Sequence, residues 1–192
     1  MDIVALTDQH AKNRALSGGK AAQLAVLIQA GFRVPPGFVV TTDMWEKYVS
    51  MPAPFNDELV GALRNACDTL SATSFAVRSS AVVEDGSQSA WAGQFSTFLD
   101  VPIDIVHERV IACFASVHSA RARAYGEERC IRADLVPMAV LVQPMIPADV
   151  AGVGFTVDPV SKDRTRVLIE SVQGNGMSLV EGTVTPDTYI LK

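Results

Sequence analysis

The sequence lacks any block of lysine or arginine, and its 16 basic residues are outnumbered by 21 acidic ones, which gives a formal net charge of −5 at pH 7. Proteins that bind nucleic acid normally carry a basic stripe or patch, so this balance disfavours a nucleic-acid partner. An anionic ligand would have to be held locally, by a few well-placed cations and backbone N–H groups.

The chain also lacks an apolar run near the ~20 residues that a membrane-spanning helix needs. Its start, MDIVALTDQHAKNR, has early acidic residues and no apolar signal-peptide core. We therefore expect no membrane partner and a cytoplasmic location. The cysteines, Cys67, Cys113 and Cys130, are odd in number and form no CxxC pair, which favours buried or idle thiols in a reducing compartment. No His, Cys or Asp cluster has the spacing of metal ligands.

With 48% hydrophobic and 19% charged residues, the composition is that of a globular protein. A chain of 192 residues is long enough for one substantial domain. Two smaller lobes, at about 1–72 and 73–192, are also possible.

The spacing of apolar residues predicts helices mainly in the first two thirds of the chain and strands mainly in the last third. We expect helices at 21–30, 43–49, 56–70 and 102–125, and strands at 38–42, 75–78, 95–101, 138–143, 151–157, 166–171 and 182–191. The strand at 138–143, MAVLVQ, is nearly all apolar, as in a strand buried on both faces. This order predicts an α+β fold, with a helical N-terminal part followed by a largely antiparallel β-rich part.

Local signals set the expected helix ends. Gly31 should stop the first helix, Asp43 should cap the second, and Asn56 or Asp57 should start the third. Gly126 should end a single long helix that Pro102 opens.

The segment Ser17-Gly18-Gly19-Lys20 lies where the first helix is expected to start. Glycines allow a ligand to approach the backbone closely, and a helix N-terminus offers N–H groups and partial positive charge. With the charge of Lys20, these features suit a phosphate. The alternative is an ordinary glycine turn with a solvated lysine, because Ala21 follows Lys20 and the Walker A spacing is absent.

A second chemical segment is Arg78-Ser79-Ser80 at the end of a predicted strand, followed by Glu84-Asp85-Gly86 in a polar stretch. Loops after strand ends are common ligand sites, and arginine suits phosphate oxygens. The alternative is a surface arginine beside a serine-rich loop.

Two further positions are candidates for ligand contact. Gly93 could admit a phosphate or ribose beside the backbone, and Thr97 could donate a hydroxyl from the strand that follows, unless both simply form a loop-to-strand junction. Gln143 ends the buried strand, where its amide needs partners that either an adenine edge or backbone groups could provide.

Four segments, in this order, resemble the phosphoenolpyruvate synthase and pyruvate phosphate dikinase family, which includes the rifampin phosphotransferases. The segments are GGKAAQLAVLIQAGFRVPPGFVVTT, FAVRSSAVVEDGSQSAWAGQFSTFLDV, VLVQPMIPADVAGVGFTVDP and EGTVTPDTYIL. The resemblance covers nearly the whole chain and identifies it as the N-terminal part of an ATP-binding domain.

The resemblance implies an ATP-grasp fold in which ATP lies between two lobes and basic residues clamp its phosphates. It also implies that ATP phosphorylates a histidine on a separate domain, which passes the phosphoryl group to pyruvate or a rifamycin-like acceptor on a further domain. These domains would belong to the rest of the enzyme or to a separate chain. By motif, the nucleotide-contacting residues are Lys20, Arg78, Gly93, Thr97 and Gln143. The family also uses Mg²⁺, whose ligands lie mostly outside this chain.

The sequence departs from the family pattern at several points. Pro144 replaces the arginine of the usual VQRM, and QGNGM at 173–177 replaces the usual WGLGE. The magnesium-binding acidic residues, the Gln-Ser-Arg-Pro segment and the phosphohistidine motif are absent from this sequence, so we expect a C-terminally incomplete domain that completes no turnover alone. Two alternatives are a non-catalytic nucleotide- or partner-binding module of the same fold and an unliganded folding fragment.

Overall fold

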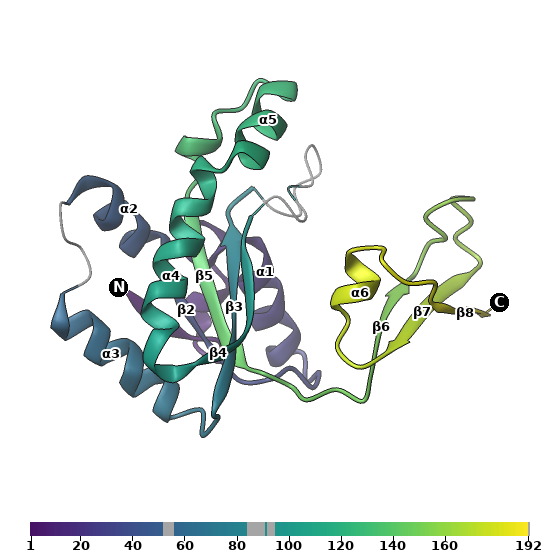
Figure 1. Cartoon of the computed structure of the whole chain (residues 1–192), viewed down its shortest axis with the longest axis horizontal. Coiled ribbons are helices and arrows are strands. Elements are labelled where there is room, and N and C mark those ends of the chain that lie inside the picture. The colour runs from purple at the N-terminus through teal and green to yellow at the C-terminus, as the bar shows by residue number, and fades with distance from the viewer. Residues whose placement is uncertain (52–55, 84–90, 92–94, 192) are drawn as a thin grey trace. The chain divides into compact units, whose positions relative to one another are not determined.

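The chain forms two compact units, Met1–Met145 and Ile146–Lys192. The structure is a computed structural model that describes residues 1–51, 56–83, 91 and 95–191. Within the first unit, strands from both sides of residue 72 pair in one sheet (Figure 1).

The first unit is built on a five-stranded sheet with the order β1-β2-β5-β3-β4. Its strands, in chain order, are β1 Ile3–Ala5, β2 Phe38–Val40, β3 Ser74–Ala81, β4 Thr97–Pro102 and β5 Met138–Pro144. All four pairings in this sheet are antiparallel. The central β5 lies between β2 and β3, and Met138 to Gln143 are all buried, which confirms the prediction of a strand buried on both faces.

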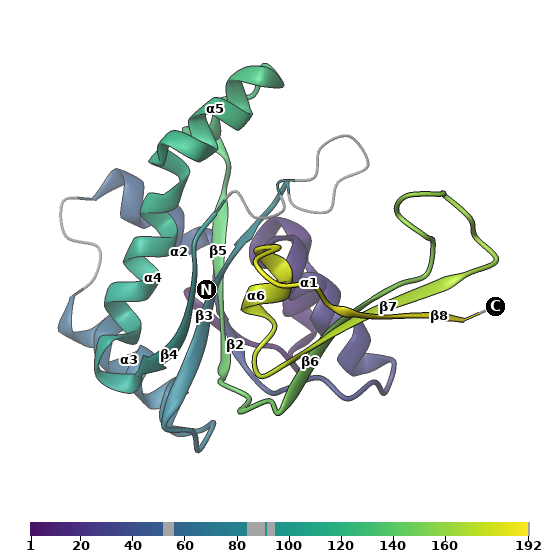
Figure 2. The same cartoon turned by 45° about the vertical axis from the view of Figure 1, so that its right-hand side comes forward.

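Helices cover the two faces of this sheet unequally (Figures 1 and 2). Helix α1 lies on one face, and α2, α3 and α4 lie on the other. The helices of this unit are α1 Arg14–Gln29, α2 Thr42–Ser50, α3 Asp57–Asp68, α4 Val106–Ala115 and α5 Ala120–Glu128, with short 3-10 turns at Gln9–Lys12, Ile103–Ile105, Ser116–His118 and Ala133–Leu135.

Alternation along the strands divides the core into two clusters. The larger cluster joins Phe75, Val77 and Val140 to the side chains of α2, α3 and α4. The smaller cluster joins Leu141 of β5 to Ala21 and Ala25 of α1, together with their neighbours. Because α1 contributes small side chains, its backbone can lie close to the sheet.

Several local predictions are confirmed by the helices and strands. Asn56 caps α3 by accepting a hydrogen bond from the Leu59 N–H at 3.0 Å, and α1 ends immediately before Ala30 and Gly31. Every strand pairing in the described residues is antiparallel. The chain therefore has the expected α+β class, with an arrangement consistent with an ATP-grasp-like domain.

Three predicted helix boundaries are wrong. Thr41 is the N-cap of α2, and Asp43 lies in its first turn. The helix expected over 102–125 is divided, because the Ser119 backbone is extended and its hydroxyl caps a new helix by accepting from the Ala122 N–H at 3.1 Å. Gly126 lies inside α5 rather than after it, where its lack of a side chain admits the Ile131 carbonyl.

The alternation expected over 95–101 is interrupted in β4. Asp100 has a φ of +52°, and the register with β3 shifts between Phe75 and Val77. This irregularity lets both Phe98 and Val101 pack against the larger core cluster, so the strand does not keep one continuous apolar face.

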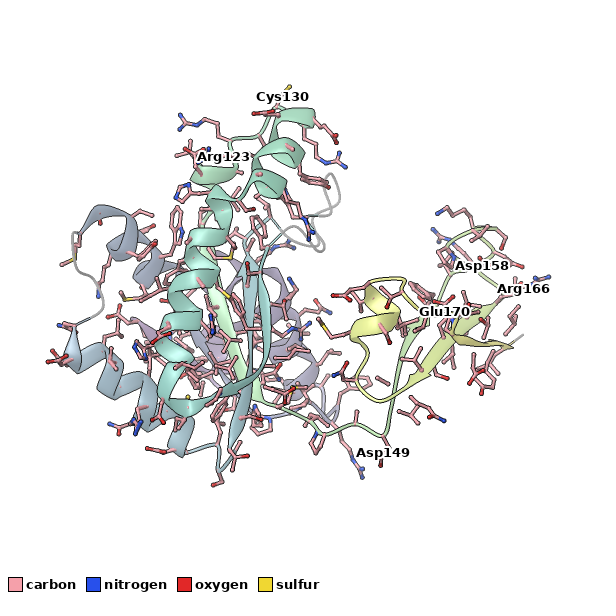
Figure 3. The ribbon with its side chains drawn as sticks, viewed as in Figure 1. Arg123, Cys130, Asp149, Asp158, Arg166 and Glu170 are labelled. Carbon is pink, nitrogen blue, oxygen red and sulfur yellow. The ribbon has the colours of Figure 1, made fainter. Side chains whose placement is uncertain are left out.

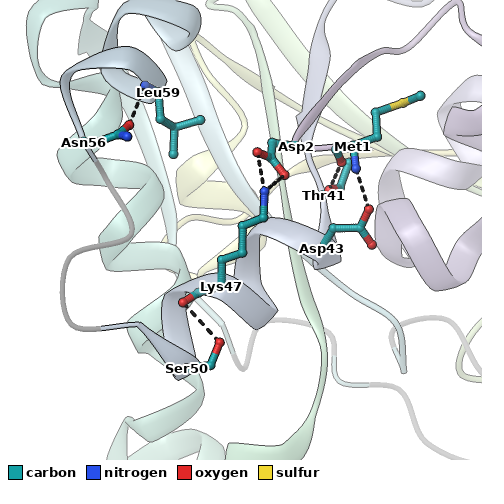
Figure 4. A network of polar contacts seen from close by, with 8 residues as sticks. All are labelled: Met1, Asp2, Thr41, Asp43, Lys47, Ser50, Asn56 and Leu59. Carbon is teal, nitrogen blue, oxygen red and sulfur yellow. Dashed lines mark hydrogen bonds and ion pairs between the residues drawn. The ribbon is translucent and has the colours of Figure 1, made fainter.

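The N-terminal strand is tied to α2 by polar contacts (Figure 4). The Lys47 ammonium lies 2.7 Å from both carboxylate oxygens of Asp2, and the Met1 amine lies 2.8 Å from Asp43. The Thr41 hydroxyl donates to the Met1 carbonyl at 2.6 Å. Such exposed ion pairs contribute little individually, but together they hold β1 at the edge of the sheet.

The second unit is a three-stranded antiparallel sheet of order β6-β7-β8 with one short helix. Its elements are β6 Val150–Phe155, β7 Val167–Gln173, α6 Met177–Val180 and β8 Asp187–Leu191. Asp158, labelled in Figure 3, orders the turn after β6 by accepting from the N–H groups of Val160 and Ser161. None of the described residues 146–191 is buried, so this sheet has no core of its own.

No helix in the described part of the chain has the length and apolar character needed to cross a membrane.

Candidate functional site

The first feature of the candidate site is a break in α1 at Gly18. This residue has φ +71° and ψ 177°, which separates a first turn beginning at Arg14 from the main helix beginning at Gly19. The conformation favours glycine, and a Cβ here would lie only 1.8 Å from the backbone oxygen of Ser80. The predicted helix start at Gly18-Gly19-Lys20 is thus present, and its backbone lies against β3.

A single hydroxyl from β3 spans this break. Ser80 Oγ donates to the Ser17 carbonyl at 2.8 Å and accepts from the Ala21 N–H at 3.1 Å. Ser80 is fully buried, so water can replace these two hydrogen bonds only if the contact between α1 and β3 opens.

Lys20 reaches the same strand. Its ammonium donates to the Ser79 carbonyl at 3.1 Å. The Cys113 thiol of α4 lies on the opposite face of the sheet, with its sulfur 4.0 Å from the Val77 carbonyl oxygen. Burial raises the pKa of this thiol to about 12. Cys113 is therefore a neutral thiol at physiological pH.

The register of the sheet places three predicted residues on the α1 face. Arg78 pairs with Thr97 of β4 on one side and with Leu141 of β5 on the other. Directly paired residues share a face, and Leu141 belongs to the cluster packed against α1. Gln143, two residues along β5 from Leu141, shares that face. Arg78 is half-buried and Thr97 is exposed.

The Gln143 amide has a backbone partner. Its Nε2 donates to the Pro35 carbonyl at 2.9 Å, and the side chain is only 6% exposed. Gly37 allows this approach, because a Cβ there would lie 2.7 Å from the Gln143 side chain. This contact supplies one partner for the buried amide, through its nitrogen.

Some candidate residues lie outside the described part of the chain, namely Gly93, Glu84, Asp85 and Gly86. Among the described residues, no three His, Cys, Asp or Glu side chains gather in a way that could hold a metal ion.

Two contacts that shape the site were not predicted from the sequence. One is made by the Ser80 hydroxyl, and the other by Arg14, whose Nε donates to the Val82 carbonyl at 2.9 Å. The partners are 59 to 68 residues apart in sequence. The sequence pattern indicates Ser80 only as a hydroxyl after the end of a predicted strand, whereas in the structure Ser80 lies within β3.

Each unit also has a hollow lined by other residues. One, of about 450 Å³, is lined by residues at β1, α2 and α3, with Asp2, Lys47 and Glu58 among them. The other, of about 360 Å³, lies within the second unit and is lined by Ser171, Gln173 and Asp187 among others.

Comparison with known proteins matches residues 47–192 to the family model described as pyruvate phosphate dikinase, AMP/ATP-binding domain. Over 91% of its length, the chain is 37% identical to the prodigiosin synthesizing transferase PigC of Serratia marcescens. Over the same share, it is 34% identical to a probable phosphoenolpyruvate synthase of Methanothermobacter thermautotrophicus and 33% identical to the rifampicin phosphotransferase of Streptomyces sviceus.

The aligned region is 22%, 31% and 24% of the length of these three proteins, respectively. The chain thus spans less than a third of the curated relatives that it matches. The match extends over most of the chain and agrees with the resemblance carried by its motifs. The chain therefore belongs to the family of pyruvate phosphate dikinase AMP/ATP-binding domains, the ATP-binding domains of phosphoenolpyruvate synthase-type phosphotransferases.

Proposed function

We propose that this chain is the nucleotide-binding part of a phosphotransferase that uses ATP to phosphorylate a histidine on a separate domain. The phosphoryl group then passes to pyruvate or a similar acceptor, such as a rifamycin-like compound. In this proposal Lys20 and Arg78 hold the phosphates, Gly93 and Thr97 contact the nucleotide beside them, and Gln143 lies near the adenine.

The observation that supports this proposal most strongly is the convergence of three separate segments on one face of the sheet. Lys20 from α1 contacts the Ser79 carbonyl of β3, and Arg78 of β3 pairs directly with Thr97 of β4. Two cations and a hydroxyl beside a helix start form an arrangement suited to an anionic phosphate chain.

The same arrangement suits the chemistry of phosphoryl transfer. This reaction depends mainly on positioning and on stabilising the charge that spreads over the phosphate oxygens. Arg78 can present a planar fork to two oxygens, whereas Lys20 provides a point charge. Bound Mg²⁺ would neutralise further phosphate charge in the complete enzyme, and we expect its ligands mostly outside this chain.

Calorimetric titration of the chain with a non-hydrolysable ATP analogue, with and without Mg²⁺, tests the proposal. Lys20→Ala and Arg78→Ala should each weaken binding by about 1–3 kcal/mol, the range for a lost charge-assisted contact, or roughly 5- to 150-fold in Kd.

Two control variants remove the same charges elsewhere. Lys12→Ala removes an exposed lysine of the preceding 3-10 turn, and Arg64→Ala removes an exposed arginine of α3 that pairs with Asp104. Both should leave Kd within about twofold, as expected for surface changes. Equal affinity in all four variants would contradict the roles of Lys20 and Arg78. Binding of ATP itself without phosphoryl transfer when the other domains are supplied would instead support the non-catalytic alternative.

A further inference from the structure

The main part of α1 begins after a residue that has no side chain to cap it. With Gly18 as the N-cap, Gly19, Lys20 and Ala21 are the first three helical positions. An N-cap side chain normally accepts a hydrogen bond from the N–H of the second or third of these residues. Gly18 has no side chain that could do so. There is also no room for one, because a Cβ added at Gly18 would lie 1.8 Å from the Ser80 carbonyl oxygen.

Ser80 provides the missing cap from another strand. Its hydroxyl oxygen lies 3.1 Å from the Ala21 nitrogen, at the third helical position, and it donates its own proton to the Ser17 carbonyl at 2.8 Å. One buried hydroxyl thus satisfies a donor after the break and an acceptor before it. The cap is supplied by a residue 59 positions away from Ala21 in sequence.

The Ser80 cap links the positions of the two candidate phosphate-binding residues, Lys20 and Arg78. Ser80 lies on the same face of β3 as Arg78, two residues along the strand, and it binds the N–H of Ala21, the residue directly after Lys20. Three consecutive residues of β3 therefore meet the start of the main α1 helix. Arg78 provides a cation, the Ser79 carbonyl accepts from Lys20, and the Ser80 hydroxyl is the cap.

We propose that Ser80 is a positioning residue that caps α1 from β3 and thereby fixes Lys20 relative to Arg78. This role rests on the proposed function, because the purpose of the fixed geometry is to bind the nucleotide phosphates. Ser80 itself does not contact the ligand.

Amide hydrogen exchange measured by NMR tests the cap without any ligand. In the unmodified chain, the Ala21 amide should be protected, although the first amides of a helix normally lack intrahelical partners. Ser80→Ala should speed its exchange relative to that of Val140 in β5 by about fivefold or more, the effect of losing a typical cap. The ratio to Val140 separates local opening from global destabilisation.

Ser116→Ala is the matched control. It removes another buried hydroxyl, which donates to the Cys113 carbonyl at 2.6 Å, away from α1. It should leave the ratio of Ala21 to Val140 exchange unchanged. Free exchange of Ala21 in the unmodified chain, or an unchanged ratio in Ser80→Ala, would overturn the cap.

Binding of the ATP analogue tests the positioning role. Ser80→Ala should weaken Kd by about fivefold or more, Ser116→Ala should not, and the Ser80→Ala effect should fall below about twofold in a Lys20→Ala background. Equal losses in both backgrounds would assign Ser80 a structural role only. If the unmodified chain binds no analogue, the proposed function and the positioning role both fail, whereas the exchange data still decide the cap.

Discussion

At the scale of single residues, Gly18 determines how closely α1 approaches the sheet. Its positive φ and its contact with the Ser80 backbone are two separate reasons for glycine at this position. From the sequence alone, the reason for glycine here was only that it lets a ligand approach the backbone. The structure shows that the close approach is made by the protein's own strand.

Gly18→Ala should therefore destabilise the fold by about 2–5 kcal/mol, because the left-handed strain adds to a collision with backbone atoms. Gly31→Ala is the matched control, since Gly31 has φ +84° but a Cβ there would meet nothing within 4 Å. It should cost only about 1–2 kcal/mol. Denaturant unfolding monitored by circular dichroism measures both, and equal losses would show that the contact with Ser80 has no energetic role.

The cysteines provide a second prediction at this scale. Burial raises the pKa of the Cys67 thiol to about 11 and that of Cys113 to about 12, whereas Cys130, labelled in Figure 3, is exposed. At neutral pH a thiol reagent should modify Cys130 rapidly and the other two only as the chain unfolds. Cys130→Ala should remove the rapid phase, and rapid modification of all three thiols would contradict the buried core.

These two thiols also give a pH dependence with a definite sign. Because the folded state favours their neutral form, their contribution to stability is complete below the ordinary thiol pKa of 9.0. It is lost as pH rises through about 11 and about 12. Cys113→Ala should therefore lose less stability than the unmodified chain between neutral and strongly alkaline pH, and identical losses would contradict a buried Cys113 thiol.

At the scale of elements, sequence patterns predicted the segments that depend on local chemistry. The Asn56 cap is a short-range signal, and the apolar run at 138–143 reflects burial on both faces. The break at Ser119 was not predicted. The internal position of Gly126 was not predicted either, because the chain turns back after α5 and places the Ile131 carbonyl against Gly126, which overrides the usual meaning of a glycine near a helix end. The site shows the same limit, since Lys20 and Arg78 stand out by type whereas the Ser80 contact spans about sixty residues.

Ser119→Ala should cost about 1 kcal/mol of stability, because α5 loses the oxygen that accepts from the Ala122 N–H. Ser119→Asp keeps a capping acceptor and should retain most of that stability. Thermal unfolding of the two variants checks this prediction. An Asp variant that is no more stable than the Ala variant would indicate that the cap does not hold the break between α4 and α5.

At the scale of the whole molecule, the two units differ in how much of each is buried. The first has two core clusters around its sheet, whereas none of the described residues 146–191 is buried. We expect the amides of β3 and β5 to exchange slowest and those of β6, β7 and β8 to exchange faster by orders of magnitude. Hydrogen exchange with mass spectrometry tests this, and equal protection of both units would contradict a coreless second sheet.

NMR titration of the isotope-labelled chain with the ATP analogue tests the proposal that the α1 face of the first unit binds nucleotide phosphates. Backbone signals should change first at Gly18 to Ala21, at Arg78 to Ser80 and at Thr97. Changes confined to the hollow lined by Asp2, Lys47 and Glu58, or the absence of changes at Lys20 and Arg78 under saturating analogue, would contradict it.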